Sequence, residues 1–343
     1  VRMEITGVPG LFTRQFAPPG VPGISCPAGK DHYVRDYEKD DNKWVRISDN
    51  GCVKYVDPET MEWKESTHCG LEEYAGWCWL DNVSKDEYSG HMLALGIVGR
   101  LVDDPRIQET VKDLLWQVGR HLVKNNMEFT DWDGRVAEHG RIHAITMGDY
   151  PGFNAAMALS FIKTAAEITG EPRFHAWYSD CLLQQSGRRP CLRGTFENPR
   201  PYTEYLPMAG LYPGPEGCKA NFNNISMHML SLHNLIWFER DPALRESYQL
   251  HFEKDVYRPV GEPRAVQFQN NALFNFMWAA HKPLGPGTDG PALDAVENGI
   301  RMLRQFPASK HRHCGECPEE KLEPYCENRF GRPAAENALE ISE

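Results

Sequence analysis

The sequence lacks any apolar run as long as a transmembrane helix, so it gives no indication of a segment that crosses a bilayer. It also lacks an excess of positive charge, because 37 lysines and arginines stand against 48 acidic residues, for a net charge of −11. Phosphate backbones and anionic lipid headgroups repel such a chain. We therefore expect neither nucleic acid nor a membrane as the main partner.

Several motifs of common enzyme classes are also missing. The chain has no glycine-rich phosphate loop, no G-x-S-x-G turn, no H-E-x-x-H motif and no C-x-x-C-H haem attachment. Nucleotide-binding, α/β-hydrolase, zincin and c-type haem chemistry therefore have no support in the sequence. We expect no resident cofactor. A metal-dependent enzyme that uses His139, His143 or His228 stays open as an alternative.

Cysteine, by contrast, is plentiful, with ten residues in three groups along the chain. This number is high for a cytosolic enzyme and ordinary in an oxidising compartment. The chain begins at Val1, as it would after removal of an export signal. We expect a secreted or periplasmic protein whose cysteines are mostly oxidised. The sequence carries no signal for the oligomeric state.

Residues 1–70 predict an N-terminal arm. Glycine and proline dominate its start, and an Asp-Asn-Gly turn at 49–51 separates two strand-like runs, 43–47 and 52–56. A lone hairpin is marginally stable in water, so we expect this one to be docked or pinned by a disulfide. We expect no independent domain here.

A helical body is predicted from residue 71 to residue 310. Apolar residues recur at helical spacing, and Asp-Pro pairs supply a cap and a first-turn proline for two of the helices. The expected helices cover roughly residues 84–102, 105–122, 153–169, 172–185, 221–240, 242–256, 265–280 and 291–305. Short turns alternating with long loops indicate paired helices that stack into a solenoid, ring or bundle. We predict one domain over residues 1–343, ending in a Cys/His-containing tail, 311–343, whose C-x-x-C motif favours disulfides over zinc.

The stretch 79–91 opens the first helix. Ser84 and Glu87 have the spacing of a capping box, which satisfies backbone N–H groups at the helix start. Asp81 and Asp86 are more polar than a cap requires. They are candidate site residues, although a solvated helix start would explain them as well.

The loop 131–143 holds the densest polar cluster. Its acids, Asp131, Asp133 and Glu138, could act as acid and base if their environments separate their pKa values. An exposed tryptophan, here Trp132, is a usual platform for a sugar ring. The alternative is a turn held by aspartate hydrogen bonds, with arginines pairing the acids. A calcium loop of EF-hand type is excluded, because Val136 stands where that loop needs glycine.

Asparagine is frequent in two of the later helices, although it is a poor residue for a helix interior. Asn224 and His228 lie near the start of one helix, and Asn271 lies in another. These residues are candidates for binding a polyhydroxylated ligand. Capping and backbone hydrogen bonding would explain one or two of them without function.

Three of these stretches resemble bacterial proteins of the six-hairpin-glycosidase-like, α/α-toroid class. Residues 79–91 look like their pattern W-x-G-D-x-S-x-D-E-x-x-G-H, with Asp81-Asn82 where the pattern has Gly-Asp. Residues 129–141 are similar to their D-x-D-G-x-x-x-x-x-G-R connection, and the asparagines between 221 and 275 look like their Asn-rich helix starts. The likeness covers roughly residues 70–305.

The resemblance implies a mainly α fold, an α/α toroid or partial toroid, and work on carbohydrate. In a glycoside hydrolase, one acid of the loop 131–143 would pair with Asp86 or Asp81 as the base. In a polysaccharide lyase, His139 or Tyr88 would abstract a proton, and Arg141 would neutralise a uronate. A non-catalytic module that binds glycan or protein is the alternative from another class.

Overall fold

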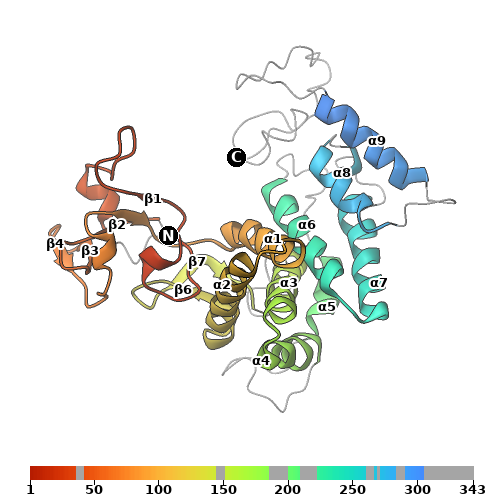
Figure 1. Cartoon of the computed structure of the whole chain (residues 1–343), viewed down its shortest axis with the longest axis horizontal. Coiled ribbons are helices and arrows are strands. Elements are labelled where there is room, and N and C mark those ends of the chain that lie inside the picture. The colour runs from red at the N-terminus through yellow and green to blue at the C-terminus, as the bar shows by residue number, and fades with distance from the viewer. Residues whose placement is uncertain are drawn as a thin grey trace. The chain divides into compact units, whose positions relative to one another are not determined.

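The computed structural model describes residues 1–35, 42–143, 151–184, 200–208, 222–259, 266–268, 271–282 and 290–304. Over these ranges the chain is mainly helical, with nine α-helices and two small antiparallel sheets (Figure 1). None of the described helices has the length and apolar character needed to span a bilayer.

Internal contacts divide the chain into two compact units, and each is described by itself. Unit 1 comprises Val1–Thr146, Ala165–Cys181 and Ser186–Glu197. Unit 2 comprises Met147–Thr164, Leu182–Gln185 and Asn198–Glu343. A single domain over residues 1–343 stays a prediction. The tail 311–343 lies outside the described residues.

Five short strands form the larger sheet of unit 1, in the order β1-β5-β2-β3-β4 with every pair antiparallel. The strands are β1 (Phe16–Ala17), β2 (Trp44–Ile47), β3 (Val53–Val56), β4 (Trp63–Glu65) and β5 (Cys78–Leu80). The predicted hairpin is confirmed as β2 and β3, which pair with Ile47 opposite Val53. The other three strands were not predicted, because runs of two or three residues carry little alternation.

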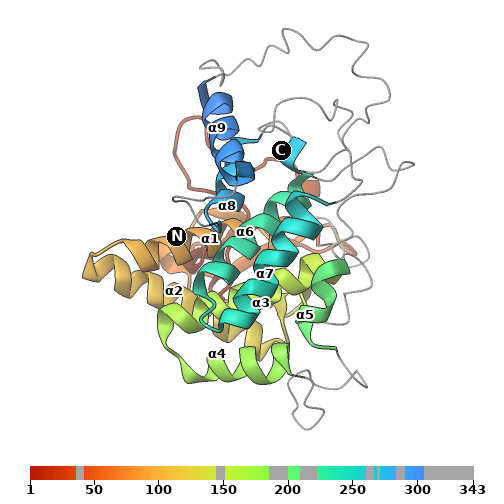
Figure 2. The same cartoon turned by 90° about the vertical axis from the view of Figure 1, so that its right-hand side faces the viewer.

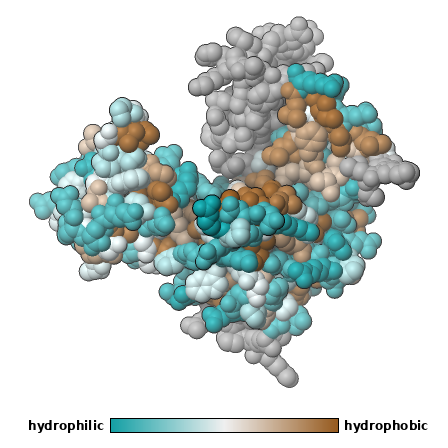
Figure 3. All heavy atoms as spheres, viewed as in Figure 1, coloured by the Kyte–Doolittle hydropathy of each residue, from teal (hydrophilic) through white to brown (hydrophobic). Residues whose placement is uncertain are grey.

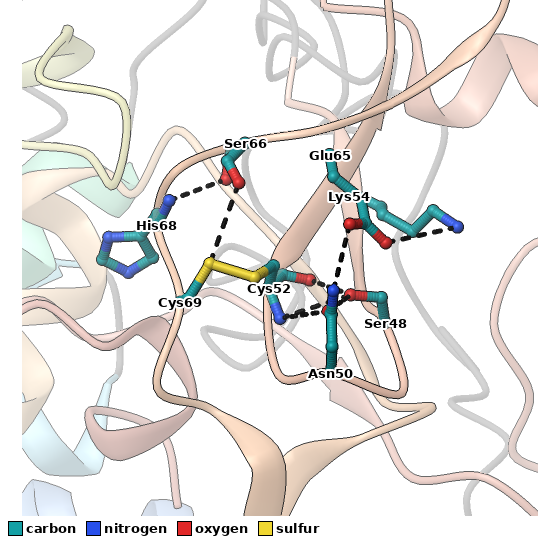
Figure 4. The surroundings of a disulfide bond; sticks show 8 residues. All are labelled: Ser48, Asn50, Cys52, Lys54, Glu65, Ser66, His68 and Cys69. Atoms are coloured by element: carbon teal, nitrogen blue, oxygen red, sulfur yellow. Dashed lines mark hydrogen bonds and ion pairs between the residues drawn. A yellow bond between two sulfur atoms is a disulfide. The ribbon is translucent and has the colours of Figure 1, made fainter.

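Two disulfides between described cysteines pin this sheet, as expected for so small a hairpin. Cys26 is bonded to Cys78, and Cys52 is bonded to Cys69. Figure 4 shows the second bond beside the hairpin turn, where the Cys52 N–H donates to Oδ1 of Asn50 at 3.1 Å. The disulfide therefore fastens the turn of the hairpin to the segment that follows β4.

The N-terminal arm packs on two long helices within unit 1. Helix α1 (Lys85–Leu101) begins with the predicted capping box, and Asp104 caps helix α2 (Pro105–Lys124). The buried Tyr88 hydroxyl donates to the carbonyl of Gly10 at 2.7 Å and accepts from the N–H of Phe12 at 2.9 Å. These bonds satisfy backbone groups of residues 10–12, which lie outside the strands of the sheet.

After α2 the chain forms a two-stranded ribbon, β6 (Glu128–Thr130) and β7 (Val136–Arg141). This ribbon replaces part of the loop predicted over 131–143, because the run 136–141 is too polar to be recognised as a strand. Unit 1 also contains helix α4 (Pro172–Ala176), which continues as the π-helix η5 (Trp177–Leu183), and η5 belongs to unit 1 up to Cys181. The fourth predicted helix is thus confirmed in extent, with its second half wound more loosely.

Unit 2 is built mostly from helices. It contains most of α3 (Pro151–Thr169), together with α5 (Tyr202–Tyr205), α6 (Phe222–Phe238), α7 (Pro242–His251), α8 (Ala272–Ala279) and α9 (Gly290–Arg304). Helices α6 and α7 lie side by side, and α8 packs on α9 (Figure 2). Helix α7 continues as a π-helix, η7 (Phe252–Tyr257). The predicted helix over 265–280 was too long, because Asn271 caps α8, and just before it the described residues form only the short η8 (Val266–Phe268).

Small residues let α9 approach α8 closely. Ala292, Ala295 and Gly299 are buried, and a Cβ atom at Gly299 would lie 2.8 Å from the Phe276 ring. Leucine and isoleucine on the rest of α9 are exposed, and Figure 3 shows apolar surface over this helix. The helix thus uses its small residues for the contact with α8.

Candidate functional site

Hydrogen bonds in unit 1 join the candidate stretches 79–91 and 131–143. The backbone N–H of Asn82, just after β5, donates to Oδ2 of Asp131 at 2.7 Å. The N–H of Glu138 on β7 donates to the Asn82 side-chain oxygen at 2.8 Å. Asn82 has φ of +56°, a left-handed conformation that asparagine tolerates better than most residues. One asparagine therefore holds the loop after β6 against the end of β5.

A buried arginine that the sequence analysis did not single out lies at the centre of the site. The Arg35 side chain is 1% exposed, contacts the Asp81 carboxylate directly, and donates from Nε to Oδ2 of Asp133 at 2.9 Å. Its guanidinium carbon lies 5.0 Å from the centre of the Trp132 ring. The only sequence signal was an excess of aspartates at 81, 131 and 133 that needed a buried cation.

Asp131 is buried within a tight turn. Its two carboxylate oxygens accept the N–H groups of Asn82 and Trp132, and its own carbonyl accepts the N–H of Gly134 at 2.9 Å. Burial raises the pKa of this carboxyl, while Arg35 and the two N–H donors oppose that rise. These contacts match the structural interpretation of the loop, a turn held by aspartate hydrogen bonds with an arginine pairing the acids.

Trp132 and Tyr88 are core residues in this fold. Trp132 is 9% exposed and packs near Tyr55 and His68, so the structure places it in the core and not on an open sugar platform. The fully buried Tyr88 hydroxyl has two backbone partners, and burial raises its pKa well above the usual value. A tyrosine in that state is a poor general base at neutral pH.

The strand β7 carries the exposed polar groups of the site. The His139 and Arg141 side chains are 59% and 51% exposed, and Nε2 of His139 lies 3.5 Å from a carboxylate oxygen of Glu138. Glu128 on β6 lies 3.4 Å from Nε of Arg141 and 2.8 Å from Nε2 of the buried His143. An imidazole and a guanidinium thus face solvent on β7, next to the carboxylates of Glu138 and the partly buried Glu128.

The start of α1 lies beside this strand. The Lys85 ammonium donates to the Arg141 carbonyl at 3.4 Å. Asp86 is half-buried in the first turn of α1, and its backbone N–H donates to the Ser84 hydroxyl at 3.2 Å. Asp86 therefore lies at the end of α1 that meets β7.

Three predicted residues, Asn224, His228 and Asn271, belong to unit 2. Asn224 lies in the first turn of α6, and Asn271 is the N-cap of α8, accepting the Leu273 N–H at 2.9 Å. This capping role is the structural alternative given for such asparagines. Asn221 and Asn270 lie outside the described residues.

His228 ends a chain of three side chains in unit 2. Its Nε2 lies 2.9 Å from Nε2 of His251, whose Nδ1 lies 2.9 Å from Oδ2 of Asp255. The carboxylate accepts the Nδ1 proton of His251, so His251 accepts through Nε2 and His228 donates. Nδ1 of His228 is then unprotonated, and it is buried without a partner among the described residues. Burial is the main cause that lowers the pKa of His228 well below its usual value.

Among the described residues, no group of three or more His, Cys, Asp or Glu side chains is placed to hold a metal ion. The metal-dependent alternative therefore gains no support from His139, His143 or His228 as they are placed here. His143 is engaged by Glu128, and His228 by His251.

The fold and site define a disulfide-bonded, mainly helical protein in which a buried Asp–Arg cluster supports an exposed histidine and arginine. Comparison of the chain with protein-family models, curated proteins and solved structures found no match. The likeness to six-hairpin-glycosidase-like proteins therefore stays an expectation from the motifs alone.

Proposed function

We propose that this protein is a secreted carbohydrate-active enzyme with an α/α-toroid arrangement of its helices, and that it acts as a polysaccharide lyase. The observation that carries the proposal is the exposure of His139 and Arg141 on one strand, β7, whose backbone is joined through Asn82 to the buried Asp131. The disulfides of the sheet support export, since such bonds persist in oxidising compartments. Its substrate is a polyhydroxylated chain that contains uronate.

Lyase chemistry needs a base and a cation. His139 would take the proton α to the uronate carboxylate, and the electron pair would expel the glycosidic oxygen by β-elimination. Arg141 would neutralise the carboxylate and so stabilise the negative charge that develops after proton removal. Tyr88, the alternative base, is buried with both of its hydroxyl bonds made to backbone, so His139 takes this role.

A glycoside hydrolase is the second candidate. It needs two carboxylates across one cleft, whereas Asp81 and Asp133 are paired by Arg35 and Asp131 holds backbone N–H groups. Glu138 and Asp86 are the other two acids that the sequence offers as candidates, and Glu138 is exposed. A hydrolase would therefore depend on Glu138 as the acid and Asp86 as the base.

Product analysis separates the two reactions. The protein is incubated with uronate-containing and neutral polysaccharides, and unsaturated uronate products and new reducing ends are measured together. We expect unsaturated products, and we expect them to be lost in His139→Ala and Arg141→Ala. The matched control is His175→Ala, an exposed histidine on α4 that should leave activity unchanged. Saturated products would favour the hydrolase, and binding without any product would favour a glycan-binding module.

A further inference from the structure

Helix α9 has two apolar faces, and α8 covers one of them. The covered face consists of small residues that are buried, namely Ala292, Ala295 and Gly299. A Cβ atom at Gly299 would lie 2.8 Å from the Phe276 ring, so α8 leaves no room for a larger side chain there. The contact of α9 with its own unit is thus made by its small residues.

The second face of α9 carries large apolar side chains that solvent reaches. Leu293 is 48%, Ile300 is 41% and Leu303 is 55% exposed, and Val296 between them is half-buried. Figure 3 shows the apolar surface over this helix. Single exposed apolar residues are ordinary on a protein surface, whereas a row of them along one helix is typical of a surface that meets a partner.

The spacing of this row is that of a coiled-coil seam. Its members are separated by three, four and three residues, which is the spacing of the a and d positions of a heptad: Leu293, Val296, Ile300 and Leu303. We call these four residues the α9 stripe. A helix in a globular core carries a wider apolar face, whereas a stripe of this width fits one further helix that lies along it. The partner is therefore a helix with an apolar stripe of the same period.

The charges of α9 favour a second copy of α9 as that helix. Its acids, Asp294 and Glu297, lie in the first half of the helix, and its bases, Arg301 and Arg304, lie in the last turn. All four side chains are exposed. In an antiparallel pair the acidic half of each copy lies beside the basic half of the other, whereas a parallel pair would place like charges together. An antiparallel pair also has two-fold symmetry, so both copies use the same surface.

From this geometry we infer that the protein forms an antiparallel, two-fold symmetric dimer through the α9 stripe. Leu293 of one copy lies opposite Leu303 of the other, and Val296 lies opposite Ile300, which is the register that covers the whole stripe. One pair of helices buries much less than the roughly 1,600 Å² of a standard interface, so the association is weak and depends on concentration. The inference is independent of the proposed lyase reaction, because it concerns association through unit 2 and uses no residue of β7.

The test is sedimentation velocity of the full chain at concentrations up to about 100 μM. We expect an equilibrium between monomer and dimer. Ile300→Glu places a charge in the middle of the stripe and should raise the dissociation constant at least tenfold, because the dimer would have to bury that charge. The matched control is Leu250→Glu on α7, which changes a leucine that is 49% exposed and lies outside the stripe. This control should dimerise as the parent does.

Two charge reversals test the pairing of the acidic and basic halves. Glu297→Arg makes the flank of the stripe mainly basic, and Arg301→Glu makes it mainly acidic. Each variant alone should dimerise more weakly than the parent, and an equimolar mixture of the two should form heterodimers. In a parallel pair like residues meet, so a single reversal would not weaken it. Variants that each dimerise as well as the parent would therefore contradict the antiparallel arrangement.

Three other results would overturn the proposal. They are a parent that stays monomeric over the whole concentration range, a dimer that survives Ile300→Glu, and a mixture of the charge variants that associates no better than its components. Thermal unfolding checks that each variant is folded. The two charge reversals decide the result if Ile300→Glu is not, since they change exposed side chains of α9.

Discussion

The backbone N–H of Asn82 donates to the carboxylate of Asp131, 49 residues further along the chain, over 2.7 Å. The contact joins the end of β5 to the turn between β6 and β7. One carboxylate oxygen of Asp131, the most buried acid of the loop, thus accepts the Asn82 N–H, and the other accepts the N–H of Trp132. The stability of unit 1 should therefore depend on this carboxylate more than on the exposed groups of β7.

Asp131→Asn tests that dependence. The amide has one oxygen where the carboxylate has two, so an NH₂ group would face a backbone N–H, and the charge that faces Arg35 would be lost. We expect the free energy of unfolding at neutral pH to fall by about 3 kcal/mol. His139→Ala should change it by less than about 0.5 kcal/mol, because that side chain is exposed. Urea denaturation measures both, and equal effects would contradict the structural role of Asp131.

Arg35 is the cation on which the acids depend. Arg35→Met leaves the Asp81 and Asp133 carboxylates without their guanidinium partner. Removing one partner of a buried ion pair lowers the free energy of unfolding by about 3–5 kcal/mol. Adding Asp81→Asn to this variant should restore part of the lost stability, since it removes the buried charge. The control is Arg106→Met, whose side chain is 92% exposed in its ion pair and should cost little. A double variant less stable than Arg35→Met would refute this account.

The helices of the body could be predicted because their signals are local. The capping box of Ser84 and Glu87, the Asp-Pro starts of α2 and α7, and the stop at Gly170 all act within one turn of helix. Asn271 shows the limit of that reasoning. Apolar residues occur on both sides of it, at 265–268 and at 272–274, and its side-chain bonds to Leu273 and Phe274 mark it as a cap.

The site could be predicted only in part, because its organising contacts join distant segments. The motifs identified Asp81, Asp131 and Glu138 as candidate site residues, yet a set of acids gives no indication of which cation neutralises them. Arg35 lies 98 residues before its partner Asp133, in an arm without helical periodicity. The burial of these acids could not be predicted either, because the spacing of polar residues in the sequence does not distinguish an exposed acid from a buried one.

The disulfides should be unequal in their effect on the sheet. Cys26 and Cys78 are 52 residues apart in the chain, against 17 for Cys52 and Cys69. The longer loop restricts the unfolded chain more, so Cys26→Ser with Cys78→Ser should cost about 4 kcal/mol, and the other pair about 3 kcal/mol. Thermal unfolding of the two double variants measures the order.

Thiol titration of the denatured, unreduced protein provides an independent check. Cys181 is also disulfide-bonded, which requires a further cysteine beyond the two pairs above, so at least six of the ten cysteines should be unreactive. A majority of free thiols would argue against both the bonds and the proposed export.

Acid should destabilise unit 1 through His121. Its Nδ1–H donates to the Pro9 carbonyl at 3.1 Å, and its Nε2 accepts the Thr130 N–H at 3.0 Å, so the ring must be neutral to keep both bonds. Burial lowers its pKa to about 4. Between the usual histidine pKa of about 6.5 and this value, the unfolded chain binds a proton that the folded chain does not, and stability falls as pH falls.

The size of the effect is about 1.4 kcal/mol per pH unit within that window, or about 3 kcal/mol in total. His121→Gln keeps a donor and an acceptor but cannot titrate, so its free energy of unfolding should depend less on pH than that of the parent. Asp131 changes the stability with pH in the opposite sense, because burial raises its pKa. Its contribution is the same in His121→Gln and in the parent, so it cancels when the pH dependences of the two proteins are subtracted. Denaturation at pH 7 and pH 4.5 gives that difference. An unchanged pH dependence in His121→Gln would show that the imidazole is already charged in the fold, or that its bonds to Pro9 and Thr130 do not form.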